Sequence, residues 1–180
     1  MILYHGTSYQ RGIKILESGC LKSNIERFYD QNCDFPTTNG YVYLTNHIFK
    51  AIHWGNITAS IEQDTKLMLF QVDVQEELLE PDYDELKYTL PFNPDSKMTF
   101  MDSLRLVYSV RVAQDIMLKQ HRGKYAEMIS THCPGNELSK LTREAARLYK
   151  EPYINNEYVS DFAKVALRKL ENVLEWKEIV

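Results

Sequence analysis

Cysteine, glycine and proline are scarce in this chain of 180 residues, which has three Cys, seven Gly and six Pro. The odd number of cysteines and the wide spacing of Cys20, Cys33 and Cys133 exclude a zinc-ligand pattern. They favour buried free thiols in a reducing compartment. No Gly- or Pro-rich tract marks a linker and no repeat is present, so we expect a single domain over residues 1–180.

The chain also lacks long apolar runs and a strong charge of one sign. No run approaches the roughly 20 residues that cross a bilayer, and polar residues begin too early for a secretion signal. We therefore expect a soluble, cytoplasmic protein without a membrane partner. With 21 basic and 25 acidic residues the net charge is -4, so a nucleic-acid contact would need a local basic patch.

Familiar catalytic motifs are missing as well. The sequence has no phosphate loop of the Walker type, no glycine-rich dinucleotide fingerprint, no zinc spacing and no nucleophile elbow. The acidic segment 80–85 lacks the spacing and the glycine of an EF-hand. We interpret it as a surface turn and expect no metal.

What is present is a pattern of short apolar segments that predicts an α+β fold with a mixed sheet. Residues 9–18 have helical spacing, with Thr7 or Ser8 as N-cap and Gly19 after the last turn. Residues 66–74 are almost continuously apolar and form the clearest strand. Other strands are expected at 2–5, 41–45, 107–112 and 124–130, and other helices at 47–60, capped by Asn46, and at 98–106.

The remaining segments are predicted to be loops and C-terminal helices. Residues 20–40 form a long loop, and prolines break residues 80–97 into acidic loops and turns. The core domain is expected to end at about residue 135, and helices with apolar stripes to fill about 136–180. Such stripes either pack on the domain or offer a surface to a partner protein.

The first predicted strand ends at His5, and Gly6 and Thr7 follow it; all three are candidates for ligand contact. A histidine at a strand end is most often structural and hydrogen bonded to backbone. Gly6 favours a functional interpretation, because a residue without Cβ lets a ligand approach the backbone N–H and C=O closely. Thr7 adds a hydroxyl.

Two aromatic residues are candidates for stacking on a ligand. Tyr43 alternates with Val42 and Leu44, so its ring faces away from them, towards either a cleft or ordinary sheet packing. Trp54 lies in the next predicted helix, where core packing is the default. A cationic aromatic group such as nicotinamide would suit two such rings.

Glu127 is the candidate carboxylate. A lone Glu in a strand usually faces solvent. Here Ala126 and Met128 flank it, and a carboxylate at an electropositive, partly apolar cleft is suited to stabilising an oxocarbenium-like centre or binding a ribose hydroxyl. The basic residues that precede it form either a solvated loop or a phosphate contact. They are Lys119, His121, Arg122 and Lys124.

The order of these pieces resembles the ADP-ribosyltransferase superfamily, on its poly(ADP-ribose)-polymerase-like His–Tyr–Glu branch. The matching positions are His5-Gly6-Thr7, Tyr43-Leu44 with Trp54, and Glu127, in three short islands within about residues 2–130. Tyr125-Ala126-Glu127, preceded by Arg122, is similar to the Gln-Ala-Glu strand of DarT-type toxins, which ADP-ribosylate bases in single-stranded DNA. Tyr125 replaces the Gln at a position that tends to contact the acceptor, which leaves the target open.

The resemblance implies an ADP-ribosyltransferase-like split mixed sheet and NAD as co-substrate, with no metal. Nicotinamide would stack near Tyr43, the backbone of Gly6 would bind its amide, and His5 would bind the adenosine-side ribose. Glu127 would bind the nicotinamide ribose and stabilise the cation that forms as nicotinamide leaves. Residues that would contact the acceptor are Tyr125, Arg122 and Lys124.

The sequence therefore predicts a mono-ADP-ribosyltransferase, a toxin of a toxin–antitoxin or phage-defence system that modifies a DNA or RNA base. Two alternatives stay open. In the first, the acceptor is a protein side chain, which the sequence pI near 5.8 favours. In the second, the chain is a binding module that has kept the fold and recognises NAD, an ADP-ribose-like ligand or a partner protein without transfer.

Overall fold

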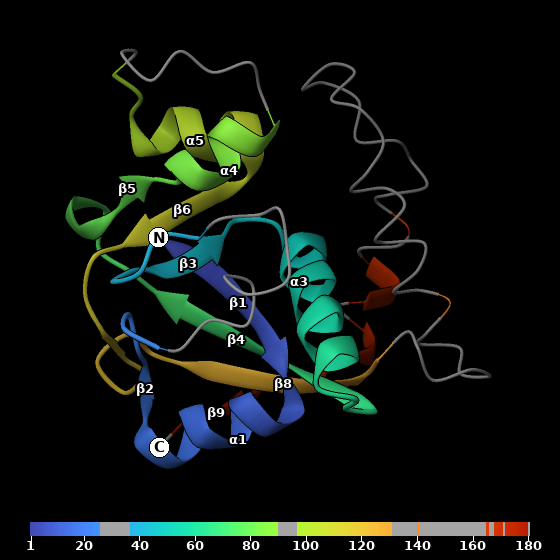
Figure 1. Ribbon diagram of the computed structural model, residues 1–180. Coiled ribbons are helices and arrows are strands. Elements are labelled where there is room, and N and C mark those ends of the chain that lie inside the picture. Colours follow the sequence, from blue (N-terminus) through green and yellow to red (C-terminus); the bar gives the residue numbers. More distant parts are fainter. Residues whose placement is uncertain are drawn as a thin grey trace.

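A central β-sheet is the frame of the computed structural model, which describes residues 1–25, 37–89, 97–130, 140, 165, 168–170 and 172–179 (Figure 1). Its strands are β1 (Ile2–Ser8), β3 (Val42–Thr45), β4 (Lys66–Asp73), β5 (Glu80–Pro81), β6 (Ser109–Val112), β8 (Lys124–Ile129) and β9 (Lys177–Glu178). A two-stranded sheet pairs β2 (Cys20–Leu21) with β7 (Ile116–Met117). The helical elements are α1 (Tyr9–Ser18), α3 (Ile48–Ile61), α4 (Tyr83–Thr89), α5 (Phe100–Val107) and the 3₁₀ turn η1 (Glu76–Leu78).

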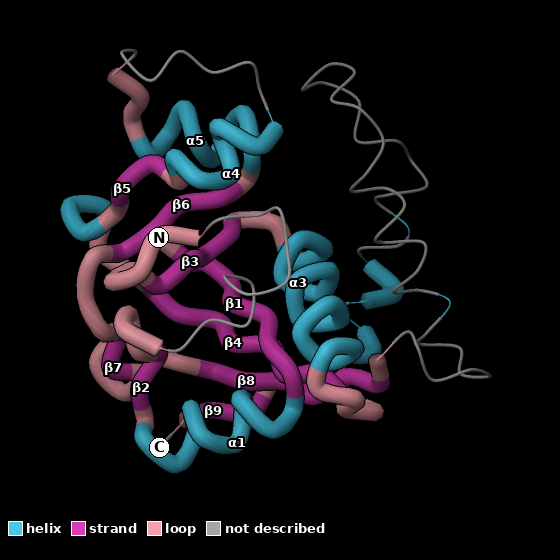
Figure 2. The backbone as a smooth tube through the Cα atoms, viewed as in Figure 1, coloured by secondary structure: helices cyan, strands magenta, loops and turns pink. Residues whose placement is uncertain are grey.

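The α+β class is thus confirmed, but the strand directions differ from the expectation of a mixed sheet. The seven strands lie in the order β5-β6-β3-β1-β4-β8-β9, which runs from top to bottom in Figure 2. Each described pair of neighbours is antiparallel. The apolar run of β4 reflects burial on both faces of the sheet. Such burial is common in parallel sheets, but it does not determine the direction of the strand.

Two cores account for that run, one on each face of the sheet. Met68 and Phe70 of β4 belong to a core against which α1 packs. Leu67 and Leu69, on the opposite face, belong to the core of α3. Alternate side chains of a strand point to opposite faces, so β4 needs apolar residues at every position. Burial on both faces is what makes β4 the most recognisable strand of the sequence.

The caps of α1 confirm the predicted helix. Ser8 has extended backbone and its Oγ accepts a hydrogen bond from the N–H of Arg11 at 3.3 Å. Gly19 ends the helix in the left-handed region, with φ 64°, as a C-terminal glycine should. The strand before α1 is longer than expected, because β1 continues to Ser8 and therefore includes Gly6 and Thr7.

Within the segment predicted to be acidic loop and surface turn, the stretch 80–89 is instead structured, and two of its carboxylates are buried. It contains β5 and α4, and Asp82 and Glu85 are only 2% and 6% exposed. Burial is possible because hydrogen bonds satisfy the Asp82 carboxylate, which accepts from the N–H of Glu85 at 3.0 Å and from the hydroxyl of Ser109 at 2.5 Å. The surface-turn interpretation was wrong for two reasons. Ser109 is distant in the sequence, and the N–H of Glu85 is positioned by helix α4, which the prolines of this segment argued against.

Two other boundaries differ. The N-cap of α3 is His47, not Asn46, and its N–H is held by Thr45 Oγ1 at 3.0 Å. Strand β9 pairs with β8 near the C-terminal end, where only helices were expected. Most of the predicted C-terminal helices and residues 26–36 of the predicted loop lie outside the described residues.

The sheet opens between β1 and β3, and we call this opening the seam. β1 pairs with β4 at seven positions, from Ile2↔Asp73 to Ser8↔Leu67. It pairs with β3 at one, Tyr4↔Thr45. Beyond that pair, the edge of β1 that carries His5, Gly6 and Thr7 leaves β3, which creates room at the centre of the sheet.

Candidate functional site

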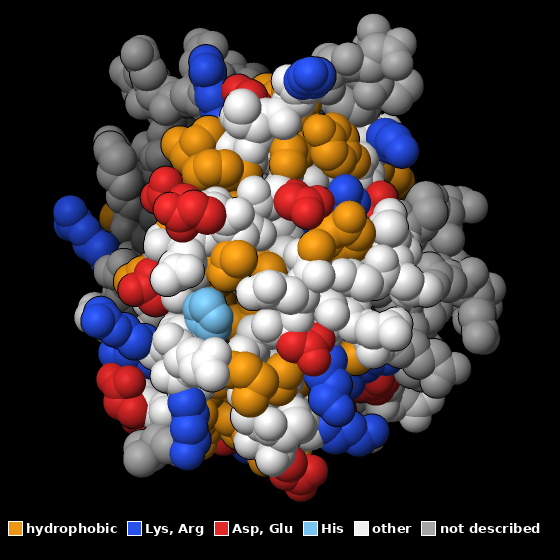
Figure 3. Space-filling model, turned by 90° about the vertical axis from the view of Figure 1, so that its left-hand side faces the viewer, with side chains coloured by type: hydrophobic (Ala, Val, Ile, Leu, Met, Phe, Trp, Pro, Cys, Tyr) orange, Lys and Arg blue, Asp and Glu red, His pale blue; other side chains and the backbone are white. Residues whose placement is uncertain are grey.

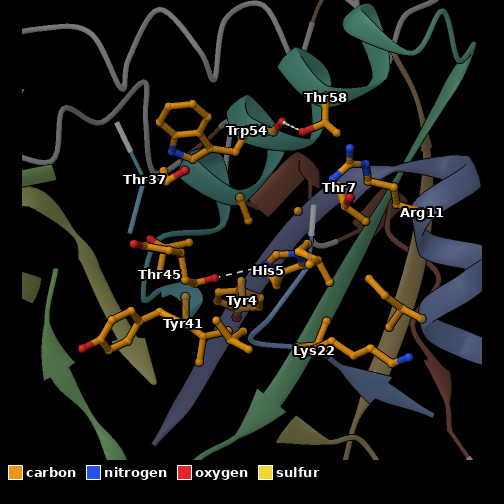
Figure 4. Close-up of a pocket in the computed structure, with 18 of the residues that line it drawn as sticks. Tyr4, His5, Thr7, Arg11, Lys22, Thr37, Tyr41, Thr45, Trp54 and Thr58 are labelled. Atoms are coloured by element: carbon orange, nitrogen blue, oxygen red, sulfur yellow. Dashed lines mark hydrogen bonds between the residues drawn. The ribbon is translucent and has the colours of Figure 1, made fainter. Parts of the chain in front are cut away.

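A cavity of about 650 Å³ lies at the seam. Its size is within the range of small-molecule and cofactor sites. Residues from β1, α1, β2, β3 and α3 line it (Figure 4). Strand ends, a loop and two helices thus surround one space, which is a common setting for a ligand.

The six residues predicted to bind a cofactor all line this cavity. They come from three separate segments of the chain: His5, Gly6 and Thr7 from β1, Tyr43 and Leu44 from β3, and Trp54 from α3. Register explains the first two groups, since Tyr4 pairs with Thr45 and the following residues of β1 face the preceding residues of β3 across the seam. Trp54 joins them because α3 crosses β1.

His5 bridges the seam. Its Nδ1 lies 3.0 Å from the backbone oxygen of Tyr43. A carbonyl oxygen can only accept, so Nδ1 carries the proton in this contact, and in the neutral ring Nε2 is then an acceptor. The contact fixes the ring orientation and tautomer at the cavity wall.

Gly6 is required by the packing of α3. A Cβ at this position would lie 1.8 Å from the backbone oxygen of Ala51. Gly55, one turn later, faces the same stretch of β1, where its own Cβ would lie 3.3 Å from the N–H nitrogen of Thr7. The space of the missing side chain at Gly6 therefore belongs to the helix. A ligand could meet Gly6 only through the N–H and C=O on the strand edge.

Tyr43 and its neighbour Tyr41 are held from the side of α4 and β6. The hydroxyl of Tyr43 forms a short hydrogen bond with the Asp84 carboxylate and lies 3.1 Å from the oxygen of Thr38. Burial would raise the pKa of Asp84, but the hydrogen bonds from Tyr43 and Thr38 outweigh it and hold that pKa below its usual value. The ring of Tyr41 stacks on Arg111, whose Cζ is 3.9 Å from the ring centroid. Both rings are fixed before a ligand enters.

Tyr41 is one of the lining residues that the sequence interpretation missed. The hydroxyl of Thr37 is another: it is buried and has no hydrogen-bond partner among the described residues. Buried polar groups are rarely left unpaired, so this hydroxyl is suited to a polar ligand atom. No motif marks either residue, and only their position before β3 could have drawn attention to them.

Glu127 lies away from the lining. Thr7 pairs with Met68, which pairs with Glu127, so Glu127 shares a face with Thr7 two strands away. Two strand spacings put their Cα atoms about 10 Å apart. The carboxylate contacts Lys66 at 3.1 Å and Lys177 at 3.4 Å. Hydrogen bonding by Lys66, and then by Lys177, holds the pKa of Glu127 below its usual value.

The three residues predicted to contact an acceptor also lie outside the cavity. Lys124 forms an ion pair with Glu178 at 2.7 Å, and Tyr125 has Lys177 5.4 Å from its ring centroid. Arg122 has a positive φ of 48° and lines a separate pocket of about 250 Å³. Acidic and basic side chains are interspersed on the face seen in Figure 3, which carries no wide basic field.

The carboxylates that do line the cavity are Glu62 and Asp82. Glu62 accepts from Arg11 Nε at 2.6 Å and forms a short hydrogen bond with the hydroxyl of Ser8. It lies just after α3, where a sequence pattern gives no reason to select it. Glu62 is thus an alternative to Glu127, among the described residues, as a carboxylate for chemistry in the cavity.

Asp82 belongs to a buried cluster with Lys50 and Glu85 that forms another part of the wall. Lys50 is 1% exposed; its Nζ lies 3.1 Å from Glu85 and donates to the oxygen of Val107 at 2.5 Å. Burial lowers the pKa of Lys50 although Glu85 and Asp82 oppose the shift. Burial raises the pKa of Asp82 and of Glu85. This cluster has the character of a structural ion pair.

Other kinds of site find no support within the described ranges. There, no three His, Cys, Asp or Glu side chains gather as metal ligands would. No helix in that part of the chain has both the length and the apolar character to cross a membrane. No protein-family model matches the chain, and no curated protein gives a significant match.

Proposed function

We propose that this protein is an NAD-dependent mono-ADP-ribosyltransferase. One observation carries the proposal: His5-Gly6-Thr7, Tyr43-Leu44 and Trp54, which form an ordered set in the sequence, line a single cavity large enough for a dinucleotide. Residues that are far apart in a chain seldom meet at one cavity by accident. This meeting supports the motif resemblance with an observation that is independent of it.

The chemistry of the lining suits each part of the dinucleotide. Aromatic rings at Tyr43 and Trp54 offer stacking surfaces for nicotinamide or adenine. The N–H and C=O of Gly6 match the C=O and N–H₂ of a carboxamide. His5 offers a ring nitrogen to a ribose hydroxyl, in the neutral tautomer described above.

Transfer breaks the bond between ribose C1′ and the nicotinamide nitrogen, and the electron pair leaves with nicotinamide. The acceptor then forms a bond to C1′ and loses its proton to solvent or a base. Because the pyridinium nitrogen is already a good leaving group, positioning and stabilisation of the oxocarbenium-like centre supply most of the catalysis. In the proposal Glu127 provides this stabilisation, for which it must reach the ribose from about 10 Å across the sheet.

The proposed acceptor is a DNA or RNA base, and the proposed context is a toxin with an antitoxin partner. The similarity of Tyr125-Ala126-Glu127 to the DarT-type strand supports it, as do the basic residues before that strand. A protein acceptor is the alternative, and the ion pair of Lys124 with Glu178 favours it, because that lysine is partly neutralised.

A second candidate function, a non-catalytic module for NAD or ADP-ribose, has an observation of its own. Glu127 is paired with two lysines outside the lining. A chain that only binds a nucleotide would need the cavity and not the carboxylate.

Labelled NAD tests the transferase and the binding module against each other. The protein is incubated with NAD labelled in its adenosine part and with single-stranded DNA, RNA or total protein. We expect label on one acceptor class and release of nicotinamide. The variants Glu127→Gln and Glu62→Gln, with Glu17→Gln as an exposed control outside the cavity, assign the carboxylate. Binding of NAD without transfer or nicotinamide release by the folded wild type would leave only the binding module.

A further inference from the structure

Three cationic side chains line one end of the cavity. Arg11 and Lys14 are one turn apart on α1, so they share a face of the helix. Lys22 follows β2 beside them. We call these three residues the cationic end. Figure 4 shows Arg11 and Lys22 across the cavity from Trp54 and Tyr41, with His5 between the two groups.

The charge of the cationic end is only partly neutralised. Arg11 is paired with Glu62 at 2.6 Å. Lys14 and Lys22 are exposed and neither forms an ion pair within the described residues. The Asp115 carboxylate is near Lys22: hydrogen bonds from Ser23, one at 2.7 Å, and to a smaller extent the charge of Lys22 lower the pKa of Asp115. In a protein with a net charge of -4, this is a local excess of positive charge on a cavity wall, and such an excess attracts anions.

The opposite end is aromatic, and the cations that the described residues place there, Arg111 and Lys50, both have partners. Arg111 lies against the rings of Tyr41 and Tyr83, at 3.9 and 5.4 Å from their centroids, and Lys50 is engaged by Glu85. A ligand that matches both ends has a planar ring at one and an anionic group at the other. A nucleotide has this composition. A base alone would match the aromatic end and leave the cationic end without an anionic partner.

We infer that the cationic end binds the diphosphate of the dinucleotide. The inference rests on the proposed function and adds an orientation: a base lies against Trp54 and Tyr41, a ribose lies near His5, and the phosphate oxygens lie between α1 and Lys22. Arg11 can donate to a phosphate oxygen and retain Glu62, because a guanidinium has five N–H donors. The two lysines act as point charges at the rim.

The test compares the double variant Lys14→Gln/Lys22→Gln with a control that loses the same charge elsewhere. Lys87→Gln/Lys97→Gln is that control, since both lysines are exposed and neither lines the cavity. Calorimetric titration with ADP, ADP-ribose and adenosine measures Kd at low and at physiological salt. We expect the first variant to bind ADP and ADP-ribose about tenfold more weakly, with a smaller salt dependence, and adenosine as the wild type does. The control should match the wild type for all three.

The outcomes separate this inference from the proposed function. If ADP binds and the double variant weakens it, yet the wild type releases no nicotinamide from NAD, the diphosphate subsite stands and the transferase fails. If the wild type turns NAD over and the double variant has the same KM for NAD, the subsite is overturned and the transferase stands. A raised KM for an oligonucleotide acceptor alone would also overturn it, and would assign the lysines to the acceptor's phosphates. Equal affinity of wild type and variant for ADP refutes it directly.

Discussion

Two groups of lysine and carboxylate side chains lie on opposite sides of the seam, and they differ in almost every respect. In one, Lys50 and Glu85 are buried, with side-chain exposures of 1% and 9%. In the other, Glu127 is 28% exposed and its partners Lys66 and Lys177 are 47% and 51% exposed. Similar distances, 3.1 Å for both Lys50–Glu85 and Lys66–Glu127, therefore describe interactions of different strength.

The contrast teaches where a carboxylate can change partners. Burial removes water from Lys50 and Glu85, so separating them leaves a bare charge, which is costly. Water competes for Glu127 and both of its lysines, so that pair is weak and easily exchanged. The buried group can hold the architecture of the cavity wall, whereas only the exposed group can release its carboxylate to a ligand.

The largest effect should come from Lys50→Met. It leaves the Glu85 and Asp82 carboxylates without their cation and the oxygen of Val107 without its donor, so we expect a loss of about 3–5 kcal/mol in the free energy of unfolding. Urea denaturation followed by circular dichroism measures it. The double variant Lys50→Met/Glu85→Leu should recover part of the loss, because it no longer leaves Glu85 charged and unpaired. A loss below about 1 kcal/mol for the single variant would mean that the buried pair behaves like an exposed one.

Glu127→Gln should change activity and leave stability almost unaltered. If Glu127 stabilises the developing cation, the transfer rate should fall about 10²–10³-fold while the Kd for NAD stays close to that of the wild type. Single-turnover release of nicotinamide, with equilibrium binding measured in parallel, gives both values. An unchanged rate together with a loss in Glu62→Gln would move the catalytic role to the carboxylate that lines the cavity.

His47 should make the stability of the region around the buried group depend on pH. Its ring lies against Tyr108, and burial first and then Lys50 lower its pKa below 6.5. Protonation therefore favours the unfolded state, so stability is fully present above about pH 6.5 and falls as the pH drops below that value. We expect the difference in unfolding free energy between wild type and His47→Gln to shrink by about 1 kcal/mol between pH 7.5 and pH 5.5. Asp82 and Glu85 contribute in the opposite direction, because their raised pKa values favour the folded state as the pH falls. Subtracting the unfolding free energy of the variant from that of the wild type at each pH cancels this contribution. A difference that does not change with pH would refute the assignment to His47.

Lys66→Met should have the smallest effect on stability. The pair is exposed, so we expect a change within about 0.5–1 kcal/mol that disappears in high salt. Thermal denaturation at low and high salt measures it. A salt-independent loss as large as that of Lys50→Met would remove the distinction between the two groups.

The sequence was informative where structure depends on neighbours in the chain. Ser8 and Gly19 delimit α1 through local hydrogen bonds and backbone geometry, and both were predictable. The convergence of His5, Tyr43 and Trp54 was also expected, from the order of the motifs along the chain, and all three line one cavity. Their detailed contacts, such as His5 Nδ1 with the oxygen of Tyr43, require the register of β1 and β3.

The remainder depends on pairings between distant segments. Lys50 and Glu85 are 35 positions apart, and no pattern in either segment indicates that the two pair. The distance of Glu127 from the cavity follows from the insertion of β4 between β1 and β8, which is a property of sheet order. The role of Gly6 as a contact surface for Ala51 needed the path of α3 over the strand.

That path has a mechanical consequence. Across the seam, the described residues join the leaf β5-β6-β3 to the leaf β1-β4-β8-β9 by one strand pair, Tyr4↔Thr45, and by the contact of His5 Nδ1 with the oxygen of Tyr43. Helix α3 clamps both leaves with adjacent residues, because Lys50 is anchored to Glu85 and Val107 of one leaf's helices while Ala51 rests on Gly6 of the other. A ligand in the cavity would act as a second clamp. Its binding should therefore slow amide hydrogen exchange on both leaves together, far from any atom that it touches.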